Sequence, residues 1–317
     1  MKIVFLDGYT INPGDLDWSL LQKLGEFVVY DRTSSSQIEE RASDAEVLIV
    51  NKTPLKSDIF AALPKLKLIC VAATGFDNID IQAARKYGIP VCNCKGYSSN
   101  CVAQMIVSLI LEVADSVGSY TLRNHEGDWI RSADFCYTIK PRLELARKKM
   151  AIIGFGNIGK TVAAIMHAFQ VDIYAVTSKS ANQLPEYVQS VTLNEAFRTC
   201  DIVSLNCPLT AENAHFVNKK LLQQAKPGLI LVNTARGALI HEDDVAEALR
   251  NGCLGAYCAD VLCNEPPRMG SPILNAPHAF ITPHIAWNTP EARIRILQIL
   301  AENIQAFVAG EYKSVVN

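Results

Sequence analysis

The chain has 317 residues, of which 49% are hydrophobic and 20% are charged. This length corresponds to about two domains of common size, and the apolar fraction is typical of a globular protein and excludes a disordered chain. The formal net charge of −2 leaves no basic field to hold a phosphate backbone, so nucleic acid binding is not expected.

The chain begins with a short apolar run that ends at Asp7, too short for the apolar core of a signal peptide. The longest apolar stretch, residues 102–111, is shorter than the roughly 20 residues of a membrane span. We therefore expect a soluble, cytoplasmic protein. The 10 cysteines lie mostly in strand-like runs and have no second pair at zinc-like spacing, so we expect buried, reduced thiols and no metal site.

The first hundred residues alternate short runs of Val and Ile with amphipathic stretches, the pattern of βαβ units and a mostly parallel sheet. The strands expected in this half are residues 2–6, 27–30, 47–50, 68–71 and 89–92. A long helical run over residues 101–119 follows. The next segment, residues 120–149, has no clear period.

A second alternation begins at residue 150 and predicts a second α/β unit. Its expected strands are residues 150–153, 172–176, 202–205, 229–232, 255–259 and 280–281. A final helix is predicted over residues 290–310, with Pro at its start and Gly at its end. Its expected core-facing residues are Ile294, Leu297, Leu300, Ile304 and Phe307.

A glycine fingerprint follows the first strand of the second unit and opens a helix, which is the context of a dinucleotide-binding turn. It comprises Gly154, Phe155, Gly156, Asn157, Ile158 and Gly159. We expect Gly154 to make the tight turn, Gly156 to let the backbone approach a pyrophosphate, and Gly159 to let the helix pack on the strand.

The acidic residue that binds the adenosine ribose in many such folds is absent after the next strand. Thr177, Ser178 and Lys179 stand there instead. Hydroxyls and a cation suit a 2′-phosphate, so NADP is favoured over NAD, although a solvated lysine in a loop would look the same.

Three further polar groups follow predicted strands, at the sheet edge where open α/β proteins bind ligands. Arg236 offers a planar fork suited to the oxygens of a 2-oxo acid. His284 can donate a proton near neutral pH, and Glu265 can hold its imidazole and favour the charged form. Singly, each has an ordinary alternative as a surface ion pair, a core histidine or a loop acid. His278 is interpreted as structural because it precedes its strand.

Together these segments resemble the D-isomer-specific 2-hydroxyacid dehydrogenases over nearly the whole chain. The resemblance lies in residues 154–159, 207–210, 233–237, 259–261 with 265–266, and 282–286. Within that family, residues 73–78 and 284–287 are most similar to the glycerate dehydrogenase, or hydroxypyruvate reductase, branch.

The resemblance implies roles for named residues. Arg236, Glu265 and His284 would be catalytic, with His284 as the acid/base. The implied substrate-binding residues are Lys52, Thr74 and Gly75, together with Arg236 and His284. The implied cofactor contacts beyond the fingerprint and residues 177–179 are Cys207, Pro208, Thr234, Ala235, Arg236, Asp260 and His284, with Asp260 binding the nicotinamide carboxamide.

The family fold further implies two doubly wound, Rossmann-like or flavodoxin-like domains with parallel sheets and an active site in the cleft between them. Residues 1–101 and 288–317 would form the substrate domain, and residues 102–287 an inserted NAD(P)-binding domain. The segment 120–149 matches the arm through which such proteins form homodimers. Arg147, Ala151, Asn206, Cys258 and Ala259 depart from the usual pattern, which puts the shape of the nicotinamide pocket in question.

The leading hypothesis is an enzyme that interconverts hydroxypyruvate, glyoxylate or a similar small 2-oxo acid and its D-2-hydroxy acid. A dinucleotide-sensing protein related to transcriptional corepressors is the alternative from another class, although the chain lacks long disordered tails. A formate or phosphite dehydrogenase would share Arg, His and the cofactor, and substrate assays would distinguish it.

Overall fold

The computed structural model describes residues 1–317. The chain forms two compact units, one of Met1–Ser98 with Trp287–Asn317 and the other of Ser99–Ala286. The chain thus passes between units after Ser98 and again after Ala286, where the sequence prediction placed these points after residues 101 and 287. Four short 3-10 helices are also present, at Gly8–Thr10, Ser35–Gln37, Ala181–Gln183 and Gly237–Leu239.

The first unit is built on a five-stranded sheet of order β2-β1-β3-β4-β5, in which all pairs are parallel. Its strands are β1 Lys2–Phe5, β2 Glu26–Val29, β3 Val47–Val50, β4 Leu68–Val71 and β5 Val91–Asn93. This is the order of flavodoxin-like doubly wound sheets. The fold expectation for this unit is therefore confirmed.

The helices of the first unit include one from each end of the chain. They are α1 Ser19–Gln22, α2 Ile38–Ala42, α3 Ser57–Ala62, α4 Ile81–Lys86 and the C-terminal α11 Pro290–Val308. Helix α11 begins at the N-cap Thr289, whose hydroxyl accepts a hydrogen bond from the Ala292 amide, and it packs against α1 and β4. The C-terminal helix is thus part of this unit's core.

The buried face of α11 differs from the one expected. Ile294 is 42% exposed, whereas Ile296 is fully buried and Arg293 is only 5% exposed. Arg293 binds both carboxylate oxygens of Asp15, at 2.7 and 2.6 Å, and donates to the Ile11 carbonyl. The periodicity therefore predicted the helix correctly but placed Ile294 on the wrong face, because a paired arginine occupies part of the buried face.

The second unit contains a seven-stranded parallel sheet of order β12-β11-β10-β9-β6-β7-β8. Its strands are β6 Lys149–Ile153, β7 Asp172–Val176, β8 Val188–Ser190, β9 Ile202–Leu205, β10 Leu229–Asn233, β11 Leu254–Ala259 and β12 Ala279–Ile281. In chain order within the unit this is the Rossmann arrangement with a seventh strand added at one edge. The edge strand β8 was not predicted.

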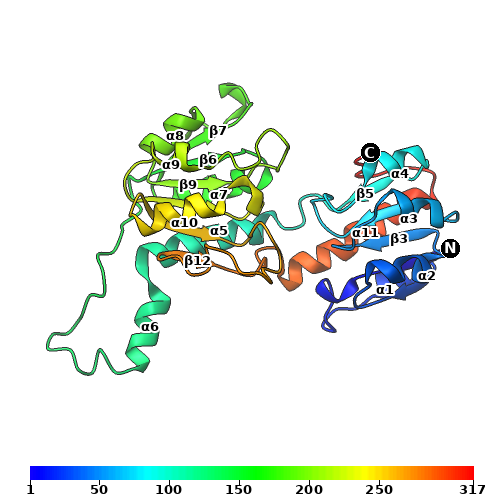
Figure 1. Ribbon diagram of the computed structural model, residues 1–317, viewed down its shortest axis with the longest axis horizontal. Coiled ribbons are helices and arrows are strands. Elements are labelled where there is room, and N and C mark those ends of the chain that lie inside the picture. The colour runs from blue at the N-terminus through cyan, green and yellow to red at the C-terminus, as the bar shows by residue number, and fades with distance from the viewer. The chain divides into compact units, whose positions relative to one another are not determined.

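The helices of the second unit are α5 Ser99–Asp115, α6 Val117–His125, α7 Asn157–Ala168, α8 Leu193–Thr199, α9 Lys219–Leu222 and α10 Glu242–Arg250. Helix α5 packs against α7, β10 and β11. In Figure 1, α6 and the segment that follows it extend away from the sheet of this unit.

The expected helix over residues 101–119 is in fact two helices. Ser116 has a φ of 54° between them, in the left-handed region, and the axes of α5 and α6 differ by 58°. Helix α6 then continues to His125, inside the segment expected to lack a period. No single helix is long and apolar enough to span a membrane; α5 and α6 together reach that length and composition, but as a bent pair whose first member is a core helix.

Candidate functional site

The turn between β6 and α7 has the geometry of a phosphate-binding turn. Gly154 has a φ of 92°, and a Cβ there would lie 2.8 Å from the Asn206 backbone. A Cβ on Gly159 would lie 2.5 Å from the Gly154 carbonyl oxygen, so the helix packs closely on the strand. Space is open beside Gly156, where a Cβ would meet nothing within 4 Å. This cradle fits the pyrophosphate of a dinucleotide.

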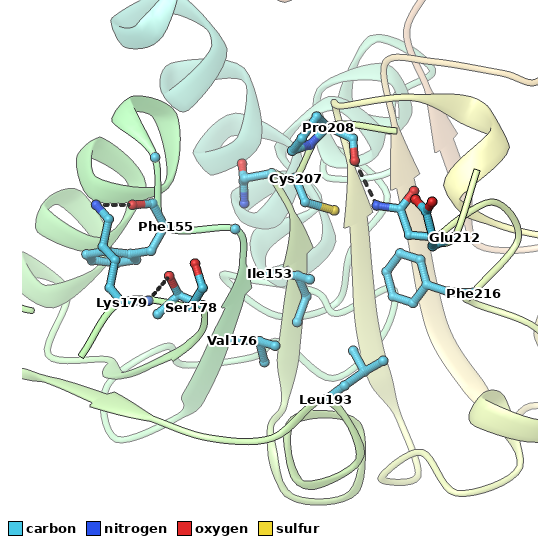
Figure 2. Close-up of a pocket in the computed structure, with 15 residues that line it drawn as sticks. Ile153, Phe155, Val176, Ser178, Lys179, Leu193, Cys207, Pro208, Glu212 and Phe216 are labelled. Carbon is cyan, nitrogen blue, oxygen red and sulfur yellow. Dashed lines mark hydrogen bonds between the residues drawn. The ribbon is translucent and has the colours of Figure 1, made fainter. Parts of the chain in front are cut away.

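A pocket of about 650 Å³ lies against this turn (Figure 2). Eight of the expected cofactor residues line it: Gly154, Phe155, Gly156, Thr177, Ser178, Lys179, Cys207 and Pro208. Asn157, Ile158 and Gly159 form the first turn of α7 beside it. Thr234, Ala235 and Asp260 do not line it; they follow β10 and β11 in the same unit.

Other residues of this pocket were not anticipated. They are Ile153, Val176, Leu193, Asn206, Glu212, Asn213 and Phe216. Asn213 shapes the wall, because its amide donates to the Pro208 carbonyl at 2.8 Å and its oxygen accepts from the Thr210 amide at 2.7 Å. The motif at residues 207–210 was the available signal, and extending it to Asn213 would have found this wall.

Lys179 reaches back over the glycine turn. Its ammonium group donates to the Phe155 carbonyl at 2.9 Å (Figure 2). Partial desolvation, and then the neighbouring ammonium group of Lys160, lower the pKa of Lys179. The two ammonium groups therefore repel each other, and an anion bound near them would relieve that repulsion.

The imidazole of His284 and the carboxylate of Glu265 form a hydrogen-bonded pair. His284 Nδ1 lies 2.5 Å from Glu265 Oε2, while Glu265 Oε1 accepts from the Leu262 amide at 2.9 Å. With Nδ1 donating to the carboxylate, Nε2 is the nitrogen that can exchange a proton with a ligand. A second pocket of about 310 Å³ is lined by both residues and by Asp260, Leu262, Ile281 and Thr282 among others.

Arg236 follows β10 in a segment with fixed backbone. The fully buried Asn233 donates its amide to the Arg236 carbonyl at 2.9 Å and accepts from the Ala235 amide at 3.0 Å. A Cβ on Gly237 would lie 2.0 Å from the Leu262 carbonyl carbon, so this segment packs backbone against backbone on the chain leading to Glu265. Arg236 and the Glu265–His284 pair thus belong to one packed set of loops.

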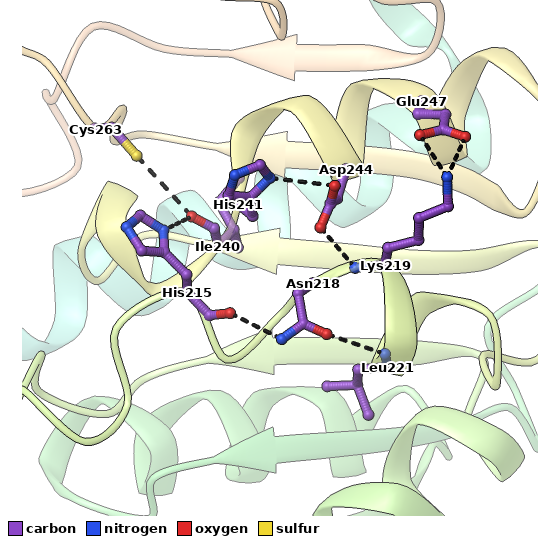
Figure 3. A network of polar contacts seen from close by, with 9 residues as sticks. All are labelled: His215, Asn218, Lys219, Leu221, Ile240, His241, Asp244, Glu247 and Cys263. Atoms are coloured by element: carbon purple, nitrogen blue, oxygen red, sulfur yellow. Dashed lines mark hydrogen bonds and ion pairs between the residues drawn. The ribbon is translucent and has the colours of Figure 1, made fainter.

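A network around the Ile240 carbonyl joins three of these loops (Figure 3). His215 Nδ1 donates to that oxygen at 2.8 Å, and the Cys263 thiol lies 4.0 Å from it. His241 Nδ1 lies 3.2 Å from an oxygen of Asp244. The loops after β9, β10 and β11 therefore meet at the Ile240 carbonyl.

The three expected substrate residues of the first unit follow β3 and β4. The amides of Lys52 and its two neighbours donate to the Asp7 carboxylate at 2.6–2.7 Å, which fixes the backbone of this turn. The Thr74 hydroxyl donates to the Cys94 carbonyl at 2.8 Å. Lys52 and Thr74 are exposed and Gly75 is half-buried. Their contact with substrate stays a prediction.

The cysteines are only partly as expected. Cys70, Cys92, Cys94, Cys101, Cys200 and Cys258 are buried, but Cys136, Cys253 and Cys263 are exposed. Burial raises the pKa of Cys92 to about 11. All ten are free thiols.

Comparison with known proteins identifies this arrangement. Residues 107–286 match the family model described as D-isomer specific 2-hydroxyacid dehydrogenase, NAD binding domain. A hydroxypyruvate reductase of Blautia hydrogenotrophica is 39% identical over the full length of both chains. The chain belongs to the D-isomer-specific 2-hydroxyacid dehydrogenase family. The expected enzyme class is thereby confirmed, and the nicotinamide dinucleotide is its cofactor.

Other members of the family extend the comparison. A glycerate dehydrogenase of Methylorubrum extorquens is 34% identical, covering 99% of this chain and 98% of its own. Among solved structures, an acyclic imino acid reductase in complex with NADPH and D-Arg matches with a TM-score of 0.88 and 27% identity over the whole of both chains. A D-lactate dehydrogenase of Aquifex aeolicus, complexed with NAD and lactic acid, matches with a TM-score of 0.85 and 26% identity over 98% of this chain and 96% of its own.

Proposed function

We propose that this dehydrogenase interconverts a small 2-oxo acid, such as hydroxypyruvate or glyoxylate, and its D-2-hydroxy acid. The observation that carries the proposal is the 2.5 Å contact between His284 and Glu265 in the unit that holds the dinucleotide pocket. The names of the relatives, hydroxypyruvate reductase and glycerate dehydrogenase, support this substrate class.

The chain's own residues supply binding and proton transfer. A reduced nicotinamide supplies hydride when it is bound. Arg236 binds carboxylate and carbonyl oxygens through its planar fork. His284 Nε2 gives its proton to the carbonyl oxygen, and Glu265 holds the imidazole through Nδ1 and stabilises its charged form. In the reverse direction neutral His284 accepts the hydroxyl proton.

A panel of 2-oxo acids assayed with NADH and with NADPH tests the proposal. We expect the highest kcat/KM with hydroxypyruvate or glyoxylate, because the relatives act on such small acids. Formate and phosphite are assayed in the oxidative direction alongside. No turnover of any 2-oxo acid, or a higher kcat/KM with formate or phosphite, would contradict the proposed function.

We further propose that NADPH is preferred over NADH. The two neighbouring cations, Lys179 and Lys160, support this preference because a 2′-phosphate bound near them would be attracted to both. Lys179→Ala should lower the ratio of NADPH affinity to NADH affinity about fivefold, because an exposed ion pair contributes roughly 1 kcal/mol to binding. Fluorescence titration of both cofactors measures this, and Lys220→Ala on α9 is the control for loss of one positive charge.

The lowered pKa of Lys179 predicts how the preference for NADPH over NADH changes with pH. Only the ammonium form of Lys179 attracts phosphate, and its pKa is lowered in the free protein. The preference for NADPH should therefore weaken on raising the pH, and should do so below the range in which an ordinary lysine titrates. A preference for NADH in the wild type would refute this assignment.

We propose that the protein is a homodimer that associates through the segment 120–149. Ile130 and Phe135 are each 89% exposed and Trp129 is 56% exposed. The Trp129 indole donates to the Phe135 carbonyl at 2.9 Å, and the Tyr137 hydroxyl donates to Asn124 on α6 at 2.7 Å. These bonds give the segment a defined shape that displays its apolar side chains, which is typical of an association surface.

Ile130→Glu combined with Phe135→Glu should convert the dimer into a monomer, because two charges would have to be desolvated in the contact. Light scattering after size-exclusion chromatography measures the mass. Replacement of the exposed Lys220 by Glu serves as the control. A wild-type protein that is monomeric at micromolar concentration would refute the dimer.

A further inference from the structure

We propose that Glu242 is a positioning residue that holds the segment 263–271, and with it the Glu265 carboxylate, in place beside His284. This inference rests on the proposed function, because it takes Glu265 as the residue that orients the acid/base. Glu242 lines neither of the two pockets, so it would act through Glu265 and not by touching substrate or cofactor.

The segment that carries Glu265 is an exposed loop. Of residues 263–271, only Pro267 and Ser271 are partly buried, and the Met269 side chain is fully exposed. Such surface loops are mobile unless specific contacts fix them. His284 Nδ1 nevertheless lies 2.5 Å from Glu265 Oε2, and a displacement of roughly 1 Å would bring this contact to the limit of a hydrogen bond. The loop therefore needs a fixed anchor.

Glu242 binds this loop at both of its ends. Its Oε1 accepts from the Cys263 amide at 2.8 Å, and its Oε2 accepts from the Ser271 hydroxyl at 2.7 Å. Hydrogen bonds to an ionised carboxylate are roughly twice as strong as those between neutral groups. Because Glu265 lies between the two donors in the chain, a single carboxylate closes the loop that contains it.

The backbone of Glu242 is itself held firmly. Glu242 is the first residue of α10, which packs against β11 and α9 and whose residues Val245 and Leu249 are buried in the core. A negative side chain is favoured in the first turn of a helix by the helix dipole. Glu242 can therefore serve as a rigid support for the more exposed loop.

The Cys263 thiol lies under the influence of both carboxylates. Partial desolvation, and then the charge of Glu242, raise the pKa of Cys263 to about 12, and the Glu265 carboxylate contributes in the same direction. Glu242 is thus near enough for its charge to act on the His284–Glu265 pair directly. A test of positioning must separate loss of this charge from loss of the two hydrogen bonds.

Glu242→Ala and Glu242→Gln make this separation. Alanine removes both hydrogen bonds, whereas glutamine removes only the charge, because its oxygen can accept from Cys263 and its nitrogen can donate to the Ser271 hydroxyl. We expect kcat with the best 2-oxo acid to fall about tenfold in the alanine variant and to stay within about threefold of wild type in the glutamine variant. A wild-type kcat in the alanine variant, or an equal fall in both variants, would overturn the proposal.

The pH profile and a double-mutant cycle show whether Glu242 acts through Glu265. Glu242→Ala should move the alkaline limb of the reductive kcat/KM profile to lower pH, as Glu265→Gln does, because the carboxylate is displaced from His284. Glu247→Ala, which breaks an exposed ion pair on the same helix, should leave the limb in place. In the Glu265→Gln background, Glu242→Ala should lower kcat by less than about threefold. An unmoved limb, or a tenfold fall in that background, would contradict the proposed role.

Amide hydrogen exchange, measured by mass spectrometry, tests the anchoring without any assay of activity. Peptides that cover residues 263–271 should exchange at least about fivefold faster in Glu242→Ala than in wild type or Glu242→Gln, because the loop opens more often. Ser271→Ala removes one of the two bonds and replaces Glu242→Ala if that variant does not fold. Unchanged exchange would overturn the proposal. Failure of the proposed function is distinguishable, because it would appear as a wild type that turns over no 2-oxo acid, whatever the exchange rates.

Discussion

Replacement of His284 by alanine is expected to lower kcat by about 10²–10⁴-fold, the usual contribution of a positioned acid/base. In the proposed mechanism His284 Nε2 is the proton donor in reduction, and His284 Nδ1 is held by Glu265. Steady-state kinetics with the best 2-oxo acid measures the loss. The Kd of NADPH should be nearly unchanged. Near-wild-type turnover would show that the His284–Glu265 pair is structural.

Glu265→Gln gives the matching test of the pair through the pH profile. In the proposed mechanism reduction uses the protonated imidazole of His284, whose Nδ1 lies 2.5 Å from the Glu265 carboxylate. The glutamine removes that charge with nearly the same shape, so the alkaline limb of the reductive kcat/KM profile should move to lower pH. In the proposed mechanism neutral His284 is the base in oxidation, so the acidic limb of the oxidative profile should also move to lower pH. Unmoved limbs would contradict the division of roles, and Glu247→Gln on α10 is the control for loss of one negative charge.

Arg236→Lys should raise KM for the 2-oxo acid and lower kcat together, because lysine keeps the charge but loses the planar fork. A hydrogen bond to a charged group is worth about 1.5–3 kcal/mol, so kcat/KM should fall about 10–100-fold. The buried Asn233 holds the backbone of this segment and should keep it folded. Arg250→Lys on α10 is the control. Unchanged KM and kcat would show that another residue binds the substrate carboxylate.

The central strands could be predicted from the sequence because parallel strands covered on both faces are continuous apolar runs. The prediction matched β3, β4, β7 and β9 residue for residue. The edge strand β8 was missed because only Val188 of its three residues is buried. In so short a segment, a single buried residue gives no periodicity from which a strand could be predicted.

Features set by single backbone angles or by tertiary pairing could not be predicted. The break at Ser116 separates two segments that are both helical, and the φ of 54° at this residue marks it. Arg293 lies on the buried face of α11 because Asp15, 278 residues away in sequence, neutralises it. The sequence around Arg293 and around Asp15 does not indicate that the two residues pair.

In the candidate site, too, some features could be predicted from the sequence and others could not. The fingerprint glycines, Lys179 and the His284–Glu265 pair follow from motifs with recognisable chemistry. The effect of Lys160 on Lys179 and the hydrogen bonds that Asp260 accepts from Thr282, Ile285 and Ala286 depend on how separate segments pack, which spacing along the chain does not encode.

The contact at Gly237 limits how the enzyme could be redesigned or diversify. The segment after Arg236 and the segment before Glu265 share one surface, and a Cβ on Gly237 would lie 2.2 Å from the Leu262 carbonyl oxygen. A loop grafted from a relative into one segment would therefore displace the other, and with it either the arginine or the carboxylate. A loop transplant that is meant to change substrate specificity must therefore transfer both segments together. Changes in the first unit leave the contact at Gly237 intact.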